Sequence, residues 1–374
     1  MHNTIIQKFL AEKIQTNLYR RRDVLIQTRS RLNFSSNDYL SLASNPAIKK
    51  AYQEGVKQHP VGSGGSMVVC GYHPIHQTLE RTFAEALGVE DALVCSSGFL
   101  ANLSVVHLLV HLKRFMMIDK EVHASIYHGL RQHKALYGRY RHNDVNALAH
   151  QLARAPEFGV IITESLFSMS GQIAPLEDLL RVGLAKNHRL VVDEAHAFGV
   201  MGPEGLGLVK QEGLGIDDVP LRIIPLGKSF ASQGAIIAGS GIWIDALLQV
   251  AYPYIYSTGI SPAWAYGVLE TLDWIRKADA RREKLSALVA YFRSQIAHSP
   301  LTWRDCKGPI QQLQLGCPKR SLQLAQDLKM RAMDCVAIRQ PTVRKAETGL
   351  RIILNHHHEC EDIDGLLTCI HEFT

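Results

Sequence analysis

The sequence lacks the patterns that mark membrane, secreted and disulfide-rich proteins. No apolar run approaches the ~18 residues of a membrane-spanning helix. The start has neither the long apolar core nor the small-residue cleavage site of a secretory signal. The seven cysteines are scattered without a Cys-x-x-Cys pair, which argues against a disulfide framework and a zinc site. We therefore expect a cytoplasmic protein with reduced thiols and no membrane partner.

Concentrated positive charge is also missing. The formal net charge is +6, and a basic balance can indicate nucleic-acid binding. The basic residues are dispersed, however, apart from Arg20-Arg21-Arg22 and Arg281-Arg282, and no basic run contains interleaved aromatic residues. A mildly basic enzyme with anionic substrates accounts for the same charge, so we expect no nucleic-acid partner.

The one run of adjacent histidines does not have the spacing of metal ligands on a helix. The chain has 18 histidines, three of which form the run His356-His357-His358. Adjacent residues do not share a helix face, as ligands four residues apart would. We expect this run to open a helix after a strand and to hold no metal.

What the chain does have is the size and periodicity of an α/β protein. Its 374 residues exceed the usual single-domain size, and 46% of them are apolar. From about residue 75 to 240, apolar strand-like runs alternate with helical periodicity, which predicts a largely parallel sheet. The expected strands are Ala92–Ser96, Phe115–Asp119, Val160–Thr163, Leu190–Asp193, Arg222–Pro225 and Ala235–Ala238. The expected helices are His76–Leu87, Ala101–Leu112, Asn143–Ala153 and Leu176–Asn187.

Both ends of the chain have a different pattern. Residues 1 to about 30 predict a polar helix ending in the Arg20-Arg21-Arg22 cluster, and a long helical region covers Ala263–Ala297. The elements expected after it are strand Ile310–Leu315, helix Ser321–Met330, strands Val336–Ile338 and Gly349–Leu354, and helix Glu361–Glu372. We expect an N-terminal helical arm at 1–36, a large α/β domain at 37–268 and a small α+β domain at 269–374.

An acidic residue and a histidine follow one of the predicted strands. The strand Leu190–Asp193 ends in a carboxylate, and His196 comes three residues later. A carboxylate held against a heterocyclic nitrogen keeps that nitrogen protonated, which makes the ring an electron sink. The alternative is an acidic strand end that caps the next turn.

Lys228 leaves the next apolar strand through a glycine, Gly227. A lysine in a cleft near other cations has its pKa lowered, which exposes the free amine for imine chemistry. The alternative is a solvated surface lysine. The combination of Asp193, His196 and Lys228 is more specific than any one of them.

Two glycine-containing segments and one more histidine complete the candidate site. Ser97-Gly98-Phe99 follows a strand and begins a helix, where backbone N–H groups suit a phosphate; the alternative is an ordinary helix cap. Gly62-Ser63-Gly64-Gly65-Ser66 lacks the third glycine of a dinucleotide fingerprint and predicts a loop that approaches a ligand. His123 follows a strand and could stack on a flat ring.

Together these features resemble the α-oxoamine synthases, fold-type I pyridoxal 5′-phosphate enzymes that condense an amino acid with an acyl-CoA and release carbon dioxide. The similarity runs almost end to end. Among the segments that carry it are Leu32-Asn33-Phe34-Ser35-Ser36-Asn37-Asp38-Tyr39-Leu40, Val122-His123-Ala124-Ser125, Phe167-Ser168-Met169, Asp193-Glu194-Ala195-His196 and Ile255-Tyr256-Ser257-Thr258. Ile338-Arg339-Gln340-Pro341-Thr342-Val343 and the early arginine cluster are most similar to members that use a pimeloyl thioester.

The resemblance implies pyridoxal 5′-phosphate as cofactor and assigns a role to each matched residue. Lys228 would carry the cofactor as a Schiff base, Asp193 would contact the pyridine nitrogen and His196 the ring hydroxyl. His123 would stack on the ring, which makes these four the expected catalytic residues. The further cofactor contacts implied are Gly98, Phe99, Ser168 and, from a partner subunit, Ser257 and Thr258.

For the substrates, the resemblance implies L-alanine and a pimeloyl thioester on CoA or a carrier protein. Their condensation would give an amino-keto acid of biotin biosynthesis, carbon dioxide and a free thiol, on a homodimer. Arg20 and Thr342 would contact the acyl substrate, and Asn37 and Arg351 the amino-acid carboxylate, with His123 beside them. A sister synthase that takes glycine, or another acyl chain, stays open as an alternative.

One departure from the family pattern lies three residues before Lys228. Family members usually have Thr or Ser there, bonding the phosphate, whereas this chain has Pro225 with neither hydroxyl nor N–H. Losing a charge-assisted hydrogen bond would weaken cofactor binding by ~1.5–3 kcal/mol, unless Ser229, Ser257 or Thr258 compensates. Pro225 is also the feature that favours an alternative from another class, a cofactor-free binding or regulatory protein.

Overall fold

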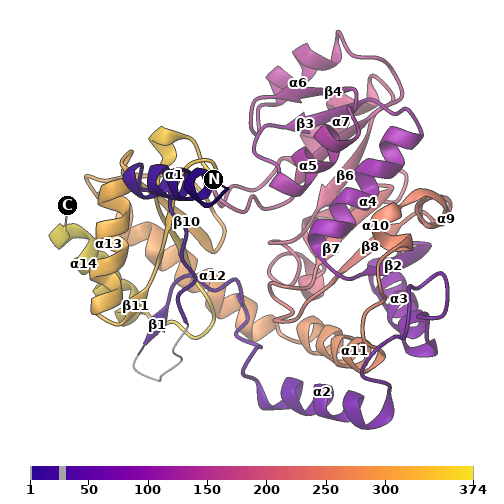
Figure 1. Ribbon diagram of the computed structural model, residues 1–374, viewed down its shortest axis with the longest axis horizontal. Helices are drawn as coiled ribbons and strands as arrows, with labels where there is room; N and C mark the ends of the chain where they lie inside the picture. Colours follow the sequence, from indigo (N-terminus) through magenta and orange to yellow (C-terminus); the bar gives the residue numbers. More distant parts are fainter. Residues whose placement is uncertain (1, 25–30, 374) are drawn as a thin grey trace. The chain divides into compact units, whose positions relative to one another are not determined.

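The computed structural model describes residues 2–24 and 31–373, which divide into two units (Figure 1). The large unit comprises Asn37–Ser168 and Ile173–Glu283, and the small unit comprises Met1–Ser36, Met169–Gln172 and Lys284–Thr374. The predicted boundaries after residues 36 and 268 stay predictions. Within the described ranges, no helix combines the length and apolar character needed to cross a bilayer.

A seven-stranded sheet forms the centre of the large unit. Its strand order is β2-β8-β7-β6-β5-β3-β4, and β8 runs antiparallel to both of its neighbours, β2 and β7. The strands are β2 (Asp91–Cys95), β3 (Met116–Asp119), β4 (Tyr137–Tyr140), β5 (Val160–Glu164), β6 (Arg189–Asp193), β7 (Leu221–Pro225) and β8 (Ala235–Gly239). The mostly parallel sheet of the predicted fold class is confirmed.

Several helices of the large unit begin where a polar side chain satisfies a free backbone N–H group. Asn45, Asp144 and Ser261 each accept such a bond at the start of α2, α6 and α11. The helices are α2 (Pro46–Gln58), α3 (Pro74–Leu87), α4 (Gly98–His111), α5 (Ala124–Gln132), α6 (Val145–Leu152), α7 (Leu176–Leu184), η1 (Pro203–Gly205), α8 (Leu208–Gln211), α9 (Gly241–Val250), α10 (Tyr252–Ile255) and α11 (Pro262–Arg276). The helix α12 (Asp279–Ile296) begins in the large unit, and its residues from Lys284 on belong to the small unit.

The helical region predicted at Ala263–Ala297 is two helices rather than one. α11 ends at Arg276 and α12 begins at Asp279. The guanidinium of Arg282 donates to the carbonyl oxygens of Ile275 at 2.6 Å and Arg276 at 3.3 Å, which the end of α11 leaves without helical partners. A periodic apolar pattern continues through this break, so the sequence pattern alone did not indicate it.

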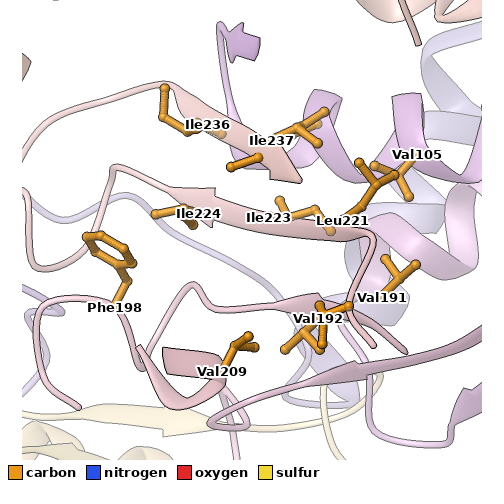
Figure 2. Packing of buried hydrophobic residues seen from close by; sticks show 14 of the residues in the cluster. Val105, Val191, Val192, Phe198, Val209, Leu221, Ile223, Ile224, Ile236 and Ile237 are labelled. Carbon is orange, nitrogen blue, oxygen red and sulfur yellow. The ribbon is translucent and has the colours of Figure 1, made fainter. Parts of the chain in front are cut away.

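The core of the large unit packs against both faces of the sheet. Apolar side chains of β6, β7 and β8 interdigitate with those of the covering helices and loops (Figure 2). Val191, Leu221, Ile224 and Ile236 are completely buried. Because these strands are covered on both faces, nearly all of their residues are apolar. Since β5, β6 and β7 run parallel, their last residues, Glu164, Asp193 and Pro225, lie at the same edge of the sheet.

The small unit contains an antiparallel sheet, the helices α1, α13 and α14, and the short helix η2. The strand order is β12-β13-β10-β9, and β1 pairs separately with β11 in parallel. The elements are α1 (His2–Gln15), β1 (Leu32–Asn33), β9 (Thr302–Trp303), β10 (Ile310–Gln314), α13 (Pro318–Met330), β11 (Met333–Asp334), β12 (Val336–Ile338), η2 (Lys345–Glu347), β13 (Gly349–Ile353) and α14 (Cys360–Phe373). Beside β1, the carbonyl oxygen of Phe34 accepts a hydrogen bond from the N–H of Ile353 at 2.8 Å.

Two sequence expectations in the small unit are wrong. The N-terminal helix ends at Gln15, because Asn17 adopts a left-handed conformation (φ 58°) and the N–H groups of Leu18 and Tyr19 bond back to Lys13. The arginine cluster therefore lies outside the helix, and residues 25–30 of the expected arm lie outside the described residues. The His356-His357-His358 run lies in a turn before α14 and does not begin that helix. The ring of His358 stacks on the ring of Phe34, with 4.2 Å between the ring centroids.

Glu80 on α3 is a buried acid, and it makes the stability of the fold pH-dependent. It accepts hydrogen bonds from the Tyr72 hydroxyl at 2.6 Å and the Val94 N–H at 2.8 Å. Burial raises the pKa of Glu80 to about 7. Because this pKa is raised on folding, its stabilising contribution is full below the ordinary value of 4.5 and is lost as the pH rises through about 7.

We expect Glu80→Gln to become more stable relative to the unchanged protein as the pH rises from 5 to 8.5. At ~1.4 kcal/mol per pKa unit, the difference in free energy of unfolding should grow by roughly 2–3 kcal/mol, as measured by urea denaturation. Glu85→Gln, on the exposed face of the same helix, is the matched control. A pH-independent difference for Glu80→Gln would contradict the prediction.

Candidate active site

Lys228 lies in the turn that joins β7 to β8. The N–H of Leu226 donates to the carbonyl of Gly234 at 2.9 Å, and the N–H of Ala231 donates to the carbonyl of Lys228 at 2.7 Å. These bonds hold the backbone of the turn, while the lysine side chain is half-buried. The turn directly follows the last residue of β7. Lys228 therefore lies at the same edge of the sheet as Asp193, the last residue of β6.

Asp193 is a buried carboxylate with a donor on each oxygen. Its Oδ2 accepts from the side-chain amide of Asn102 on α4 at 2.8 Å, and its Oδ1 accepts from the N–H of Ala195 at 2.9 Å. The next residue, Glu194, forms a buried ion pair with Arg222 of β7, with 2.6 Å between Oε2 and Nε. The two donors fix the position of the Asp193 carboxylate.

His196 is oriented by a tyrosine that the sequence pattern did not assign. Its Nδ1 lies 2.6 Å from the hydroxyl of Tyr39, and that hydroxyl lies 3.3 Å from Oδ1 of Asn37. Tyr39 is completely buried. Since Nδ1 faces Tyr39, the Nε2 atom of His196 is the one that a ligand would meet.

His123 forms the N-cap of α5 and lies near the other candidate residues. Its Nδ1 accepts from the Ser125 N–H at 3.3 Å and lies 2.8 Å from the Ser125 hydroxyl. The pKa of His123 is lowered, mainly because surrounding protein displaces water; the charge of Asp193 opposes this shift and the charge of Lys228 adds to it. The structure thus brings His123, Asp193 and Lys228 together.

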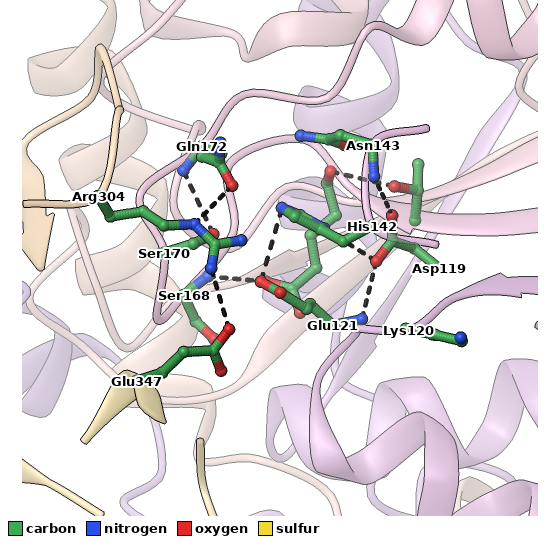
Figure 3. Close-up of polar contacts among 12 residues, drawn as sticks. Asp119, Lys120, Glu121, His142, Asn143, Ser168, Ser170, Gln172, Arg304 and Glu347 are labelled. Carbon is green, nitrogen blue, oxygen red and sulfur yellow. Dashed lines mark hydrogen bonds and ion pairs between the residues drawn. The ribbon is translucent and has the colours of Figure 1, made fainter. Parts of the chain in front are cut away.

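A cluster centred on His142 shapes the loop that leads to His123. His142 lies between two carboxylates, with Nδ1 3.0 Å from Asp119 and Nε2 3.5 Å from Glu121 (Figure 3). Asp119, the last residue of β3, also accepts from the N–H groups of Glu121 at 2.7 Å and Asn143 at 2.9 Å. These bonds define the backbone path from β3 to His123. Sequence reasoning assigned no role to Asp119 or His142.

Gly98 and Phe99 begin α4, as the sequence predicts for a phosphate site. The Ser97 hydroxyl accepts from the Leu100 N–H at 3.2 Å, and the N–H groups at the first helical positions have no intrahelical partner. A Cβ atom on Gly98 would lie 2.7 Å from the side chain of Pro225. The proline that replaces the usual hydroxyl residue therefore packs directly against this helix start.

Ser257 and Thr258 line a pocket with Ser96, Leu100 and Met67 of the same chain. The glycine-rich loop at 62–66 lies against them. Thr258 forms an isolated antiparallel β-bridge with Ser66, and the N–H of Gly259 donates to the carbonyl of Gly65 at 2.8 Å. The predicted loop and the two hydroxyl residues are thus brought together. The expected contribution of Ser257 and Thr258 from a partner subunit stays a prediction.

The donor set of the large unit fits pyridoxal 5′-phosphate. Asp193 suits a protonated ring nitrogen, Nε2 of His196 a ring hydroxyl, Lys228 an aldehyde and the start of α4 a phosphate. Among the described residues, no group of three metal-ligating side chains is placed to hold a metal ion.

Ser168 is a buried residue of the large unit, whereas the candidate residues Arg20, Thr342 and Arg351 lie in the small unit. Arg351 is on β13 opposite Gln312 and Val336, and is 8% exposed. The N–H of Thr342 donates to the carbonyl of Arg339 at 3.0 Å. Burial lowers the pKa of Arg339, and the charge of Arg20 lowers it further. Arg20 and Arg339 therefore form a basic group within this unit, and Thr342 lies next to it.

The sequence profile of the family described as aminotransferase class I and II matches residues 29–370. A curated 8-amino-7-oxononanoate synthase from Methylococcus capsulatus is 40% identical over 348 residues, covering 93% of this chain and 90% of that protein. One from Pseudomonas putida (strain W619) is 38% identical over 370 residues, with 96% and 95% covered.

Solved structures agree with this placement. A crystal structure of 8-amino-7-oxononanoate synthase from Francisella tularensis superposes with a TM-score of 0.81 at 28% identity, covering 92% of this chain and 98% of that one. A serine palmitoyltransferase from S. paucimobilis with a bound PLP–myriocin aldimine has a TM-score of 0.91 at 22% identity over 98% of this chain and 96% of that one, which shows the fold alone. The predicted family is confirmed, and the chain belongs to the aminotransferase class I and II family together with relatives named 8-amino-7-oxononanoate synthase.

Proposed function

We propose that this chain is a pyridoxal 5′-phosphate-dependent acyltransferase that condenses L-alanine with a pimeloyl thioester. The products are 8-amino-7-oxononanoate, carbon dioxide and a free thiol, in a step of biotin biosynthesis. The observation that carries the proposal is that Lys228, Asp193 and His123 lie close together at one edge of the sheet. The relatives of the chain are named for this reaction.

The reaction needs a carbanion at the α-carbon of alanine. When bound, the cofactor supplies an electron sink for that negative charge. The amine of Lys228 removes the α-proton and later returns one to the same carbon. Asp193 keeps a proton on the ring nitrogen, and His196, oriented by Tyr39, donates to the ring hydroxyl.

The bond changes balance without a further oxidant or reductant. A carbon–carbon bond forms between the α-carbon and the thioester carbonyl carbon, and the carbon–sulfur bond breaks to release the thiol. The alanine carboxylate then leaves as carbon dioxide, and a proton takes its place on the α-carbon.

His123 suits a stacking role because its pKa is lowered. A neutral imidazole places no second positive charge beside Lys228, so it does not oppose cationic states of that amine. Its Nδ1 is engaged by Ser125, which fixes the orientation of the ring. Ser168, Gly98 and Phe99 complete the cofactor contacts that we propose.

For the substrates, we propose that Arg20 and Thr342 bind the acyl chain and that Asn37 and Arg351 bind the alanine carboxylate. An acyl chain ending in a carboxylate would find complementary charge in the basic group that contains Arg20. Guanidinium groups bind carboxylates bidentately, which adds geometric selectivity to charge.

We also propose that the protein is a cytoplasmic homodimer. Tyr252 and Tyr256, which precede Ser257, are 59% and 78% exposed, and Phe99 is 42% exposed. Large exposed aromatic side chains near a ligand site are typical of a protein–protein interface. Such an interface would bring Ser257 and Thr258 of each subunit to the partner's cofactor phosphate.

The reaction is tested by offering L-alanine or glycine with pimeloyl-, succinyl-, acetyl- or decanoyl-CoA and measuring thiol and carbon dioxide release. We expect the alanine and pimeloyl pair to give the highest kcat/KM by at least ~100-fold, because a carboxylate at the end of the pimeloyl chain can form charge-assisted hydrogen bonds with arginine. A preference for glycine or another acyl chain would assign the chain to a sister synthase. A purified protein without cofactor absorbance, even after reconstitution, would contradict the enzymatic proposal.

Pro225→Thr is expected to tighten cofactor binding. The threonine hydroxyl would lie beside the start of α4 and could donate to the phosphate, which is worth ~1.5–3 kcal/mol, or roughly a 10- to 100-fold lower Kd. The measurement is an absorbance titration of the apoprotein. Pro225→Ala, which removes the ring without adding a hydroxyl, is the control. Equal affinities for the two variants would contradict the prediction.

A further inference from the structure

Glu164, the last residue of β5, lies beside Asp193. The two residues are paired in the parallel register of β5 and β6. Side chains at paired positions of neighbouring parallel strands point to the same face of the sheet. Two carboxyl groups therefore stand next to each other at the edge that carries Lys228, although only Asp193 has a part in the proposed reaction.

The surroundings of Glu164 connect two segments of the candidate site. Its Oε2 accepts a hydrogen bond from the N–H of Ser168 at 3.0 Å, and the backbone of His123 lies close enough to the carboxyl group to lower its pKa. Ser168 and His123 are both proposed to flank the cofactor, and they lie on different loops. Glu164 is thus a shared anchor for these loops.

The second oxygen of Glu164 is buried and has no hydrogen-bond partner among the described residues. The residue as a whole is 2% exposed. A buried carboxylate oxygen without a donor is costly when it is charged, whereas a protonated oxygen is not. Asp193, by contrast, receives a donor on each oxygen.

This difference decides which of the two groups carries the charge. Two neighbouring carboxylates in a dry environment cannot both ionise easily. Burial raises the pKa of Glu164 well above its ordinary value, the charges of Asp193 and Asp119 raise it further, and the N–H of Ser168 and the backbone of His123 oppose the shift. Glu164 is therefore the member of the pair that keeps its proton.

We propose that Glu164 is a positioning residue of the active site: a neutral carboxylic acid that fixes the Ser168 and His123 loops and leaves Asp193 as the single anion at the cofactor ring. The inference rests on the proposed function for the identity of the ring. It adds that the site contains an acid whose proton stays in place throughout the reaction.

The test compares Glu164→Ala with Glu164→Gln in the full-length protein. Alanine removes the anchor, so we expect the Kd for pyridoxal 5′-phosphate to rise at least ~10-fold and kcat to fall roughly 10- to 100-fold. Glutamine retains a carbonyl acceptor for the loops and mimics the neutral acid, so it should recover most of both losses. The pH profile of cofactor absorbance should be the same in Glu164→Gln as in the unchanged protein.

Two outcomes would overturn the inference. If glutamine is as damaging as alanine, or shifts the pH profile, Glu164 acts as a charged group. If alanine changes neither cofactor affinity nor kcat, Glu164 positions nothing. Should Glu164→Ala fail to fold, Glu164→Gln against the unchanged protein still decides. The cofactor titration needs no acyl substrate, so failure of the proposed reaction would appear separately, as absent turnover by the unchanged protein.

Discussion

Replacing Lys228 by alanine is expected to abolish turnover and to remove the near-visible absorbance of the bound cofactor. Lys228 supplies the amine that links the cofactor to the protein and the base that moves the α-proton of alanine. Loss of a positioned base alone costs ~10²–10⁴-fold in rate, and loss of the link adds to this. We therefore expect kcat to fall by at least about 10³-fold, measured as thiol release.

The control is Lys210→Ala, which removes an exposed lysine from the same unit. It should retain both absorbance and activity, because Lys210 lies on α8 and has no part in the proposed site. A Lys228→Ala protein that turns over at the normal rate would show that another amine carries the chemistry. The turn around Lys228 is held by backbone bonds, so the variant should fold.

Asp193→Asn is expected to have the second-largest effect. The asparagine has the same shape and keeps a partner for Asn102, but it has no charge with which to hold a proton on the ring nitrogen. Removing one member of a buried, hydrogen-bonded charge pair costs ~2–5 kcal/mol, which corresponds to a loss of roughly 30- to 5,000-fold in kcat.

Cofactor affinity should fall less than kcat in Asp193→Asn, because phosphate contacts and Lys228 remain. Steady-state kinetics together with a cofactor titration separate the two effects. Asp178→Asn, the same change at an exposed position of α7, provides the control. An Asp193→Asn protein with normal kcat would remove Asp193 from the proposed mechanism.

The sequence predicted the central sheet well because its inner strands are covered on both faces. β5, β6, β7 and β8 are apolar runs, and their observed bounds lie within one residue of the expected ones. β4 was missed because it is an edge strand whose residues Tyr137-Gly138-Arg139-Tyr140 are mostly accessible, so they form no apolar run. Gly138 packs closely on Met117 of β3, a contact that only the folded chain reveals.

The sequence predicted the site residues that directly follow the end of a strand. It did not predict the residues that hold them in place, because these come from distant parts of the chain. Asn102 meets Asp193 across 91 positions, and Tyr39 meets His196 across 157. No local pattern contains such pairs. Glu164 could have been predicted in the same way as Asp193, because both are acidic residues that end apolar strands at the same edge of the sheet.

The pairing of β1 with β11 bears on how the chain is made. Leu32 and Met333 are partners in that ladder, and Phe34 bonds to Ile353. At ~5–20 residues per second, the ribosome needs roughly 15–60 s to add the ~300 residues that separate the two strands. Strand β1 therefore cannot form this pairing until β11 has been synthesised, whereas all seven strands of the central sheet lie within Asp91–Gly239. Consequently we expect the small unit of a nascent chain to become resistant to proteases later than the large unit.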